Sequence, residues 1–170
     1  NLLRTKVEVE FPKENFEQIF SNFKNIMDFV DENTLETEQF EENPDLLKIE
    51  NTQKNSYYLH FDSLRSNCRV TRQPDFGDIF IYYNSKKHIK EESLIKYLIS
   101  FRKEYHFHEE CCEMVYKRLF DILDKNDELF VCALYTRRGG IDICPLRTNC
   151  SIKDAQKLLD MTKYAKYGVR

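Results

Sequence analysis

The hydrophobic residues change their period twice between residues 55 and 144, and this change constrains the fold more than any other feature of the chain. Residues 57–61 and 79–83 alternate in the two-residue period of a strand. Residues 91–104 and 107–122 instead place apolar side chains every three or four positions, as helices do. A further strand follows over residues 129–133. The pattern therefore predicts the order strand, strand, helix, helix, strand.

Two breaks divide the predicted strands. Gln73-Pro74-Asp75-Phe76-Gly77 interrupts the first pair, since Pro and Gly are the strongest turn signals. The first pair is expected to be antiparallel, joined by a bent segment that carries Cys68 and Asp75. The later strand is expected to end at Arg137-Arg138-Gly139-Gly140, and residues 141–144 are expected to resume it.

Charge and apolar content exclude several classes of protein. The 26 basic and 29 acidic residues nearly balance, so the net charge of −3 gives no general attraction to nucleic acid or anionic lipid. No stretch approaches the roughly 20 apolar residues of a membrane span. The six cysteines are irregularly spaced, which favours free thiols. We therefore expect a cytoplasmic protein with no direct nucleic acid or membrane partner.

The ends of the chain differ from its middle. Residues 5–11 alternate like a strand that needs a partner sheet, and residues 12–53 are polar and acidic with one short apolar helical face. Because the chain begins without Met, we expect it to be part of a longer protein. The predicted division is 1–54 for the end of a first module plus an acidic connector, 55–150 for a compact module, and 151–170 for a C-terminal helix and tail.

Cys68 and Asp75 are a thiol and a carboxyl group on the same predicted bend. A thiolate can add to an electrophilic carbon such as that of a nitrile, and a neighbouring carboxylic acid can protonate the nitrogen. Arg69 and Arg72 lie close enough in sequence to activate the thiol. Taken singly, Cys68 also fits a half-buried filler, and Asp75 fits an ordinary turn residue after Pro74.

Five motifs follow one another along the chain: Ser66-Asn67-Cys68, Gln73 to Gly77, Tyr97 to Arg102, Phe107-His108-Glu109 and Tyr135 to Ile143. In order and spacing they resemble the NADPH-dependent 7-cyano-7-deazaguanine reductases, and they are closest to the catalytic second half of the two-module form. The resemblance implies an α+β tunnelling fold, in which two helices pack on one face of an antiparallel sheet. It also implies reduction of a nitrile to an aminomethyl group through a cysteine thioimide, in queuosine biosynthesis.

The resemblance assigns roles position by position. It makes Cys68 the nucleophile and Asp75 the proton donor. It places His108 and Glu109 on the substrate, where a carboxylate can accept two N–H groups of the deazaguanine edge. Arg138 and Gly139 match the family positions that contact NADPH, although a hairpin turn would also explain them. The implied partners are a small deazapurine substrate and a second copy of the full-length protein in a homodimer.

The sequence departs from the family pattern in three places. Lys90-Glu91-Glu92-Ser93 stands where single-module enzymes carry a Glu-Ser-Lys-Ser signature, so the charges of the Glu and Lys positions are reversed. In the two-module form this signature lies in the first module. Cys144 replaces a usual Asn, and Leu146 replaces a usual aromatic residue.

Three other interpretations remain open at this point. An amidine-forming relative would make the same thioimide but admit ammonia in place of hydride. A zinc site would use the nearby group of His106, His108, Cys111 and Cys112, although no Cys-x-x-Cys pair supports it and we expect no metal. An isolated module without its first domain would be inactive.

Overall fold

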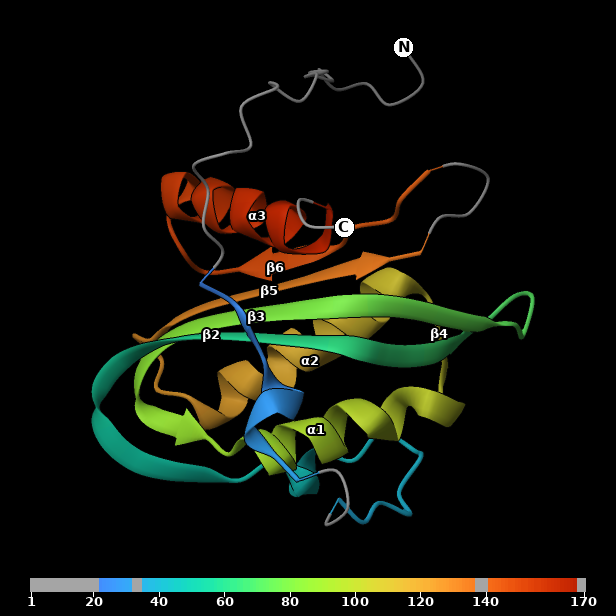
Figure 1. The fold of residues 1–170 in the computed structure, drawn as a ribbon, viewed down its shortest axis with the longest axis horizontal. Coiled ribbons are helices and arrows are strands. Elements are labelled where there is room, and N and C mark those ends of the chain that lie inside the picture. Colours follow the sequence, from blue (N-terminus) through green and yellow to red (C-terminus); the bar gives the residue numbers. More distant parts are fainter. Residues whose placement is uncertain (1–21, 32–34, 137–140, 168–170) are drawn as a thin grey trace.

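A long twisted sheet organises the molecule (Figure 1). The computed structural model describes residues 22–31, 35–136 and 141–167. In these residues β2 (Ile49–Cys68) and β3 (Pro74–Ile89) form an antiparallel pair, and β5 (Glu128–Tyr135) and β6 (Leu146–Thr148) extend the sheet beyond β3. The short strands β1 (Lys24–Asn25) and β4 (Tyr105–His106) pair in parallel with β2.

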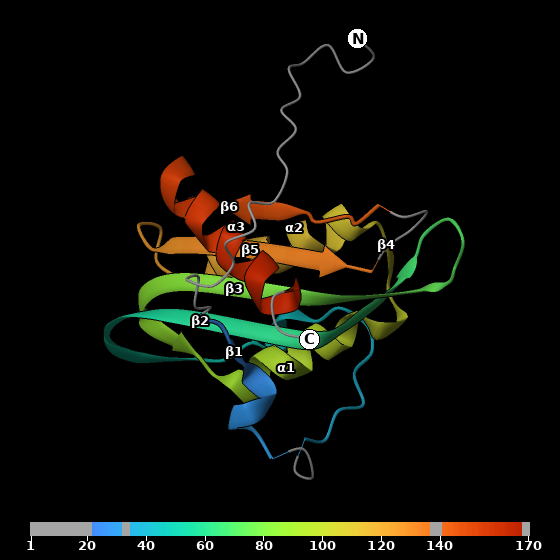
Figure 2. The same cartoon turned by 45° about the horizontal axis from the view of Figure 1, so that its top comes forward.

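Two helices cover one face of this sheet, and a third covers the other. The helix α1 (Glu91–Ile99) continues into the 3-10 turn η4 (Ser100–Lys103), and α2 (His108–Ile122) follows β4. The helix α3 (Ile152–Tyr167) lies on the opposite face, as both views show (Figures 1 and 2). The predicted α+β class, with two helices on one face of an antiparallel sheet, is therefore confirmed. Among the described residues, no helix is both long and apolar enough to span a bilayer.

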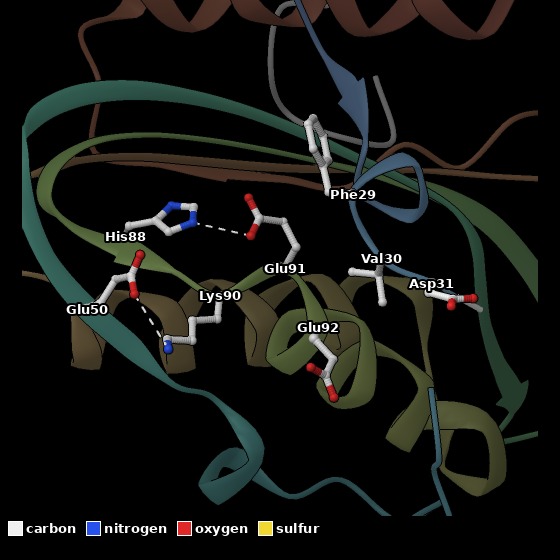
Figure 3. Close-up of a pocket in the computed structure, with 8 residues that line it drawn as sticks. All are labelled: Phe29, Val30, Asp31, Glu50, His88, Lys90, Glu91 and Glu92. Carbon is white, nitrogen blue, oxygen red and sulfur yellow. Dashed lines mark hydrogen bonds and ion pairs between the residues drawn. The ribbon is translucent and has the colours of Figure 1, made fainter. Parts of the chain in front are cut away.

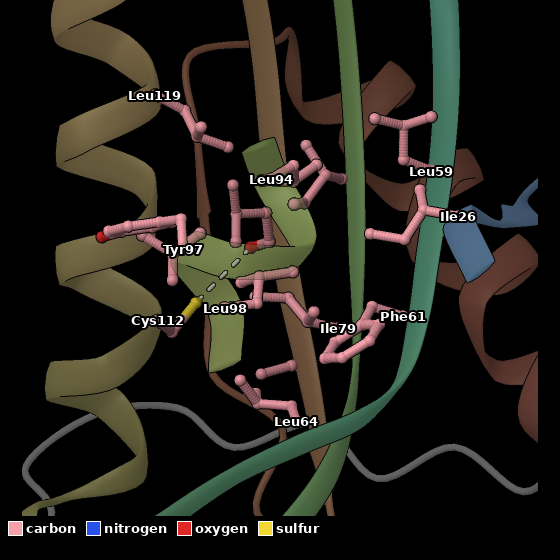
Figure 4. Close-up of a cluster of buried hydrophobic side chains, with 14 of the residues drawn as sticks. Ile26, Leu59, Phe61, Leu64, Ile79, Leu94, Tyr97, Leu98, Cys112 and Leu119 are labelled. Atoms are coloured by element: carbon pink, nitrogen blue, oxygen red, sulfur yellow. Dashed lines mark hydrogen bonds between the residues drawn. The ribbon is translucent and has the colours of Figure 1, made fainter. Parts of the chain in front are cut away.

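The main core lies between the sheet and the helices α1 and α2 (Figure 4). Leu98 of α1 and Leu119 of α2 are fully buried against sheet residues such as Phe61 and Ile79. The three- and four-residue spacing of the helices produces this packing, because it gathers the apolar side chains on one face of each helix. Ile26, from the 3-10 turn η1 (Ile26–Phe29), closes the core at one side and is only 1% exposed.

A second core lies beneath α3. Phe80, Tyr82 and Phe130 point to this face and pack against Leu158 and Met161 of the helix. The central strand β3 is consequently buried on both faces, which is a property of sheets that carry helices on each side. The C-terminal helix predicted for residues 151–170 is confirmed over residues 152–167.

Two strand boundaries differ from the predictions. The strand β2 begins at Ile49, six residues before the predicted module start. The strand expected at residues 141–144 is wrong, because regular pairing with β5 occurs at residues 146–148. Among the described residues before it, Ile141 forms an isolated bridge, Tyr135 N–H donates to the Ile143 carbonyl at 3.2 Å, and Ala133 N–H donates to the Pro145 carbonyl at 3.0 Å. Pro145 has no N–H to return, which interrupts the ladder.

Some predictions fall outside the described residues. They are the strand at residues 5–11 and the turn at residues 137–140, which includes Arg138 and Gly139. The division into 1–54, 55–150 and 151–170 stays a prediction.

Candidate active site

Cys68 ends β2 and begins a tight turn that leads to Pro74, the first residue of β3. The Cys68 N–H donates to the Gln73 carbonyl at 2.8 Å, and the Arg72 N–H donates to the Cys68 carbonyl at 2.9 Å. Arg72 has a φ of 57°, a left-handed conformation that costs energy for a residue other than Gly. The turn directs the Thr71 N–H to the Cys68 sulfur, at a distance of 3.5 Å. An N–H donated to sulfur stabilises a thiolate.

The strand register places Asp75 on the same face of the sheet as Cys68. Asp75 lies directly opposite Ser66, and Cys68 is two residues beyond Ser66 on the same strand. Residues two apart on a strand share a face, so Cys68 and Asp75 are diagonal neighbours across the pair. Both side chains are buried, at 5% exposure each. The sequence prediction that the bend brings these two residues to one place therefore agrees with the register.

Asp75 forms a buried pair with His108, the first residue of α2. The Oδ2 atom of Asp75 lies 3.1 Å from Nε2 of His108, which is the separation of an ion pair, although the ring nitrogen is not aligned for a regular hydrogen bond. The imidazole stacks on the ring of Tyr135, with centroids 3.9 Å apart and planes 6° from parallel. The stack and the carboxylate together fix the plane and position of the imidazole.

Tyr135, Ser66 and Cys111 form a buried polar group behind this pair. The hydroxyls of Ser66 and Tyr135 lie beside the Cys111 thiol, although neither is aligned for a regular hydrogen bond. Burial raises the pKa of the Cys111 thiol, and burial followed by the neighbouring Cys111 raises that of the Tyr135 hydroxyl well above its usual value. These groups are therefore neutral. No role is predicted for these three residues from the sequence, although Ser66 and Tyr135 each begin one of the family motifs.

Glu109 differs from His108 in being exposed at the start of α2. It lines a shallow hollow of about 380 Å³, so its carboxylate is open to a small molecule. The first turn of a helix favours negative charge in any case, so the role of Glu109 as the substrate carboxylate stays a prediction. The hollow is lined by Arg69, His106, Glu109, Glu110, Glu113, Met114 and Arg147.

Arg69 makes its contacts on the α2 side of the turn. Its Nη1 lies 2.9 Å from a carboxylate oxygen of Glu110, and its Nε donates to the Tyr105 carbonyl at 3.4 Å. Its guanidinium also lies over the Phe107 ring, 5.4 Å from the centroid. The Thr71 N–H donates to the Cys68 sulfur, so a backbone donor joins the two cations, Arg69 and Arg72, whose role in activating the thiol stays a prediction.

The segment Lys90 to Ser93 lies at the other end of β3, where α1 begins. It borders a second hollow, of about 350 Å³, in which Nε2 of His88 lies 3.2 Å from Glu91 and the Lys90 ammonium lies 3.5 Å from Glu50 (Figure 3). The Ser93 hydroxyl donates to the Lys90 carbonyl at 2.7 Å. These side chains are therefore engaged with their own neighbours, at the end of β3 remote from Cys68.

The four residues considered for zinc do not converge. His108 contacts Asp75, and Nε2 of His106 lies 3.1 Å from Glu104. The Cys112 thiol donates to the carbonyls of Val131 and Pro145, at 3.6 Å and 3.5 Å. Among the described residues, no group of three or more such side chains is placed to hold a metal ion.

The fold and the site define a class: an α+β module with a buried thiol, carboxyl and imidazole at one end of its sheet. Comparison with known proteins adds a likeness to one family. Residues 74–154 match the family model described as QueF-like protein. The family resemblance drawn from the motifs is confirmed by this match and by the curated relatives.

Several curated relatives carry the name NADPH-dependent 7-cyano-7-deazaguanine reductase. The one from Hydrogenovibrio crunogenus is 44% identical over 68% of this chain and 41% of its own length. The relative from Buchnera aphidicola is 42% identical over 71% of this chain and 45% of its own length. The relative from Rickettsia akari is 51% identical over 53% of this chain and 32% of its own length. The chain thus spans less than half the length of the relatives it matches.

A solved structure of the archaeosine synthase QueF-Like in the apo form also resembles the chain. The matched region covers 61% of this chain and 99% of the chain in that structure, with a TM-score of 0.49 and 13% sequence identity. At this level the likeness adds no argument about function.

Proposed function

We propose that the protein reduces the nitrile of 7-cyano-7-deazaguanine to an aminomethyl group in queuosine biosynthesis, with NADPH as reductant and Cys68 as nucleophile. One observation carries the proposal: the Cys68 sulfur accepts the Thr71 N–H on the same face of the sheet as the buried Asp75–His108 pair. A nucleophile and a proton source are therefore held together. The names of the curated relatives supply the substrate and the reductant.

The first chemical step joins the nitrile carbon to Cys68. The thiolate sulfur forms a bond to the carbon, and one pair of electrons of the carbon–nitrogen triple bond moves to nitrogen. The nitrogen takes a proton from Asp75, which gives a neutral thioimide. Because Asp75 and His108 lie 3.1 Å apart in a buried site, the pair holds one proton between them, and its transfer through Asp75 to the nitrogen leaves a carboxylate beside a neutral imidazole.

Glu109 is proposed to orient the substrate. Its carboxylate is exposed at the start of α2, the helix whose first residue is His108 of the buried pair. Two N–H groups of the deazaguanine edge suit the two carboxylate oxygens. The hydrogen bonds would fix the ring plane and thereby bring the nitrile carbon to the sulfur.

The described residues fit a phosphate-bearing cofactor at this end of the sheet. Arg72 is exposed on the turn after Cys68, and a guanidinium suits phosphate groups. We propose that Arg72 assists Arg138 and Gly139 in holding NADPH. When bound, two equivalents of NADPH in succession would supply the two hydrides that this four-electron reduction requires, and the bond between the carbon and the Cys68 sulfur would break between the two transfers.

The remaining parts of the proposal concern the whole protein. We propose a small-molecule substrate and a cytoplasmic homodimer, with the Glu and Lys of the missing signature supplied by another module. The charged residues of the Lys90 to Ser93 segment support this, because they are engaged in local pairs.

Mass spectrometry of the full-length protein incubated with 7-cyano-7-deazaguanine, without NADPH, tests the chemistry. We expect a mass increase equal to one substrate molecule, lost in Cys68→Ala and retained in Cys144→Ala, which removes an exposed cysteine. An adduct retained in Cys68→Ala contradicts the assignment of the nucleophile. Adding NADPH or ammonia to the adduct separates reduction from amidine formation, since only the reductase releases the aminomethyl product.

A further inference from the structure

We infer that Glu110 is a positioning residue, which holds the turn carrying Cys68 against the start of α2. The inference rests on the proposed function for its effect on the reaction, whereas its geometry is independent of the substrate. Glu110 lies one residue beyond Glu109 and is part of neither the buried pair nor the sulfur contact.

The two carboxylate oxygens of Glu110 contact different elements. Oε2 accepts the Phe107 N–H at 2.8 Å, as a glutamate in the third helical position does in one half of a capping box. Oε1 lies 2.9 Å from Nη1 of Arg69, the residue after Cys68. One side chain thus joins the helix start to the turn.

The strand β4 makes this connection rigid. Cys68 is paired with His106, and the Asn67 N–H donates to the Glu104 carbonyl at 2.8 Å. Nδ1 of His106 also lies 3.6 Å from Oε2 of Glu110. The carboxylate is therefore the point at which the end of β2, the strand β4 and the first turn of α2 meet.

The arrangement has a consequence for the reaction. His108 and Glu109 move with the start of α2, whereas Cys68 moves with the turn after β2. A small shift between the two would displace the bound nitrile from the sulfur, and misplacements of about 1 Å reduce rates by up to about a hundredfold. Glu110 therefore sets the rate of thioimide formation more than the affinity for the base.

Two substitutions separate the two contacts of the carboxylate. Glu110→Gln keeps an oxygen for the Phe107 N–H but loses the charge that faces Arg69, and Glu110→Ala loses both. We expect Glu110→Ala to form the adduct about tenfold more slowly at saturating substrate, with Glu110→Gln between it and the wild type. Arg69→Gln should resemble Glu110→Gln, and the double variant should be no slower than either, since they share one contact.

Glu92→Gln is the matched control. Glu92 also lies in the first turn of a helix and pairs with a cation, the Lys96 ammonium at 2.7 Å, but it lies at the start of α1. We expect wild-type adduct formation in this variant. Equal rates for Glu110→Ala, Glu92→Gln and the wild type would overturn the inference.

Alkylation by iodoacetamide gives a readout that needs no substrate. In Glu110→Ala the loosened turn should expose Cys68, so its alkylation should be severalfold faster even though adduct formation is slower. Cys111 is 1% exposed and reports on global unfolding. Unchanged Cys68 alkylation, or equal acceleration at Cys68 and Cys111, contradicts a local positioning role. If the wild type forms no nitrile adduct, the proposed function fails while this readout still decides the role of Glu110.

Discussion

The two ends of β3 carry similar side chains but arrange them differently. At the Pro74 end, Asp75 and His108 are buried, at 6% and 5% side-chain exposure, and lie 3.1 Å apart. At the Ile89 end, Glu91 and His88 form a comparable pair at 3.2 Å, but their side chains are 25% and 17% exposed. Both pairs join a carboxylate to an imidazole, so burial and neighbours decide what each pair can do.

This difference in burial indicates that the Pro74 end of β3 is the one suited to catalysis. A buried pair exchanges its proton with a bound group, because water does not compete and the surrounding charges are weakly screened. A more exposed pair is screened by solvent and contributes little beyond local stability. The hollow at the Ile89 end (Figure 3) is therefore interpreted as a surface feature, although it contains more carboxylates.

Asp75→Asn is the substitution that should affect the reaction most among those that preserve Cys68. The amide has the same shape but cannot donate a carboxylic proton, so we expect turnover to fall by a factor of about 10² to 10⁴. Substrate binding, measured by calorimetry in a Cys68→Ala background, should change little. A comparable loss of binding and turnover would refute the role of Asp75 as proton donor.

Tyr83→Phe tests the Ile89 end as a structural region. The Tyr83 hydroxyl accepts the buried Ile89 N–H at 3.1 Å, so its removal should lower the free energy of unfolding by about 1–3 kcal/mol. Burial raises the pKa of Tyr83, so the unfolded chain loses this proton first as the pH rises above about 10, and wild-type stability should fall there.

Tyr83→Phe should show less of this alkaline loss, as measured by urea unfolding at several pH values. Adduct formation at neutral pH is expected to be unchanged. A slowed reaction in a folded variant would show that the Ile89 end contributes to the site.

Glu91→Gln should have the smallest effect. It breaks a partly exposed pair with His88, so we expect a change within about 0.5 kcal/mol in the free energy of unfolding and a wild-type rate of adduct formation. The measurement is a thermal unfolding curve alongside the adduct assay. A large loss of activity would mean that the segment Lys90 to Ser93 retains the substrate role of the family signature.

Periodicity explains why much of the fold was predictable. The helices over residues 91–104 and 107–122 were found because their apolar spacing is that of the face they bury, and the strands because alternation marks the faces of a sheet. The strand near residue 141 was misplaced, since Ile141 to Ile143 alternates like a strand while Pro145 prevents regular pairing until Leu146.

The candidate site was less accessible to sequence reasoning. The motifs predict Cys68, Asp75 and His108 as site residues. The donor to the Cys68 sulfur is the backbone N–H of Thr71, and a pattern of side chains cannot predict a backbone donor. The sequence does not predict a role for Glu110, because the helix dipole by itself favours a glutamate in the first turn of a helix.

The sequence by itself determined the order of the elements, the likeness to the reductases and the residue types available for chemistry, because these depend on local spacing and composition. Only the tertiary structure decided which carboxylate is buried against an imidazole, which is held at the surface, and which N–H meets the sulfur. These distinctions depend on strand register and on contacts between Cys68, Asp75, His108 and Glu110, which lie up to 42 residues apart in the sequence. Register and packing are set by the whole sheet and its helices together, so they emerge only when the chain has folded.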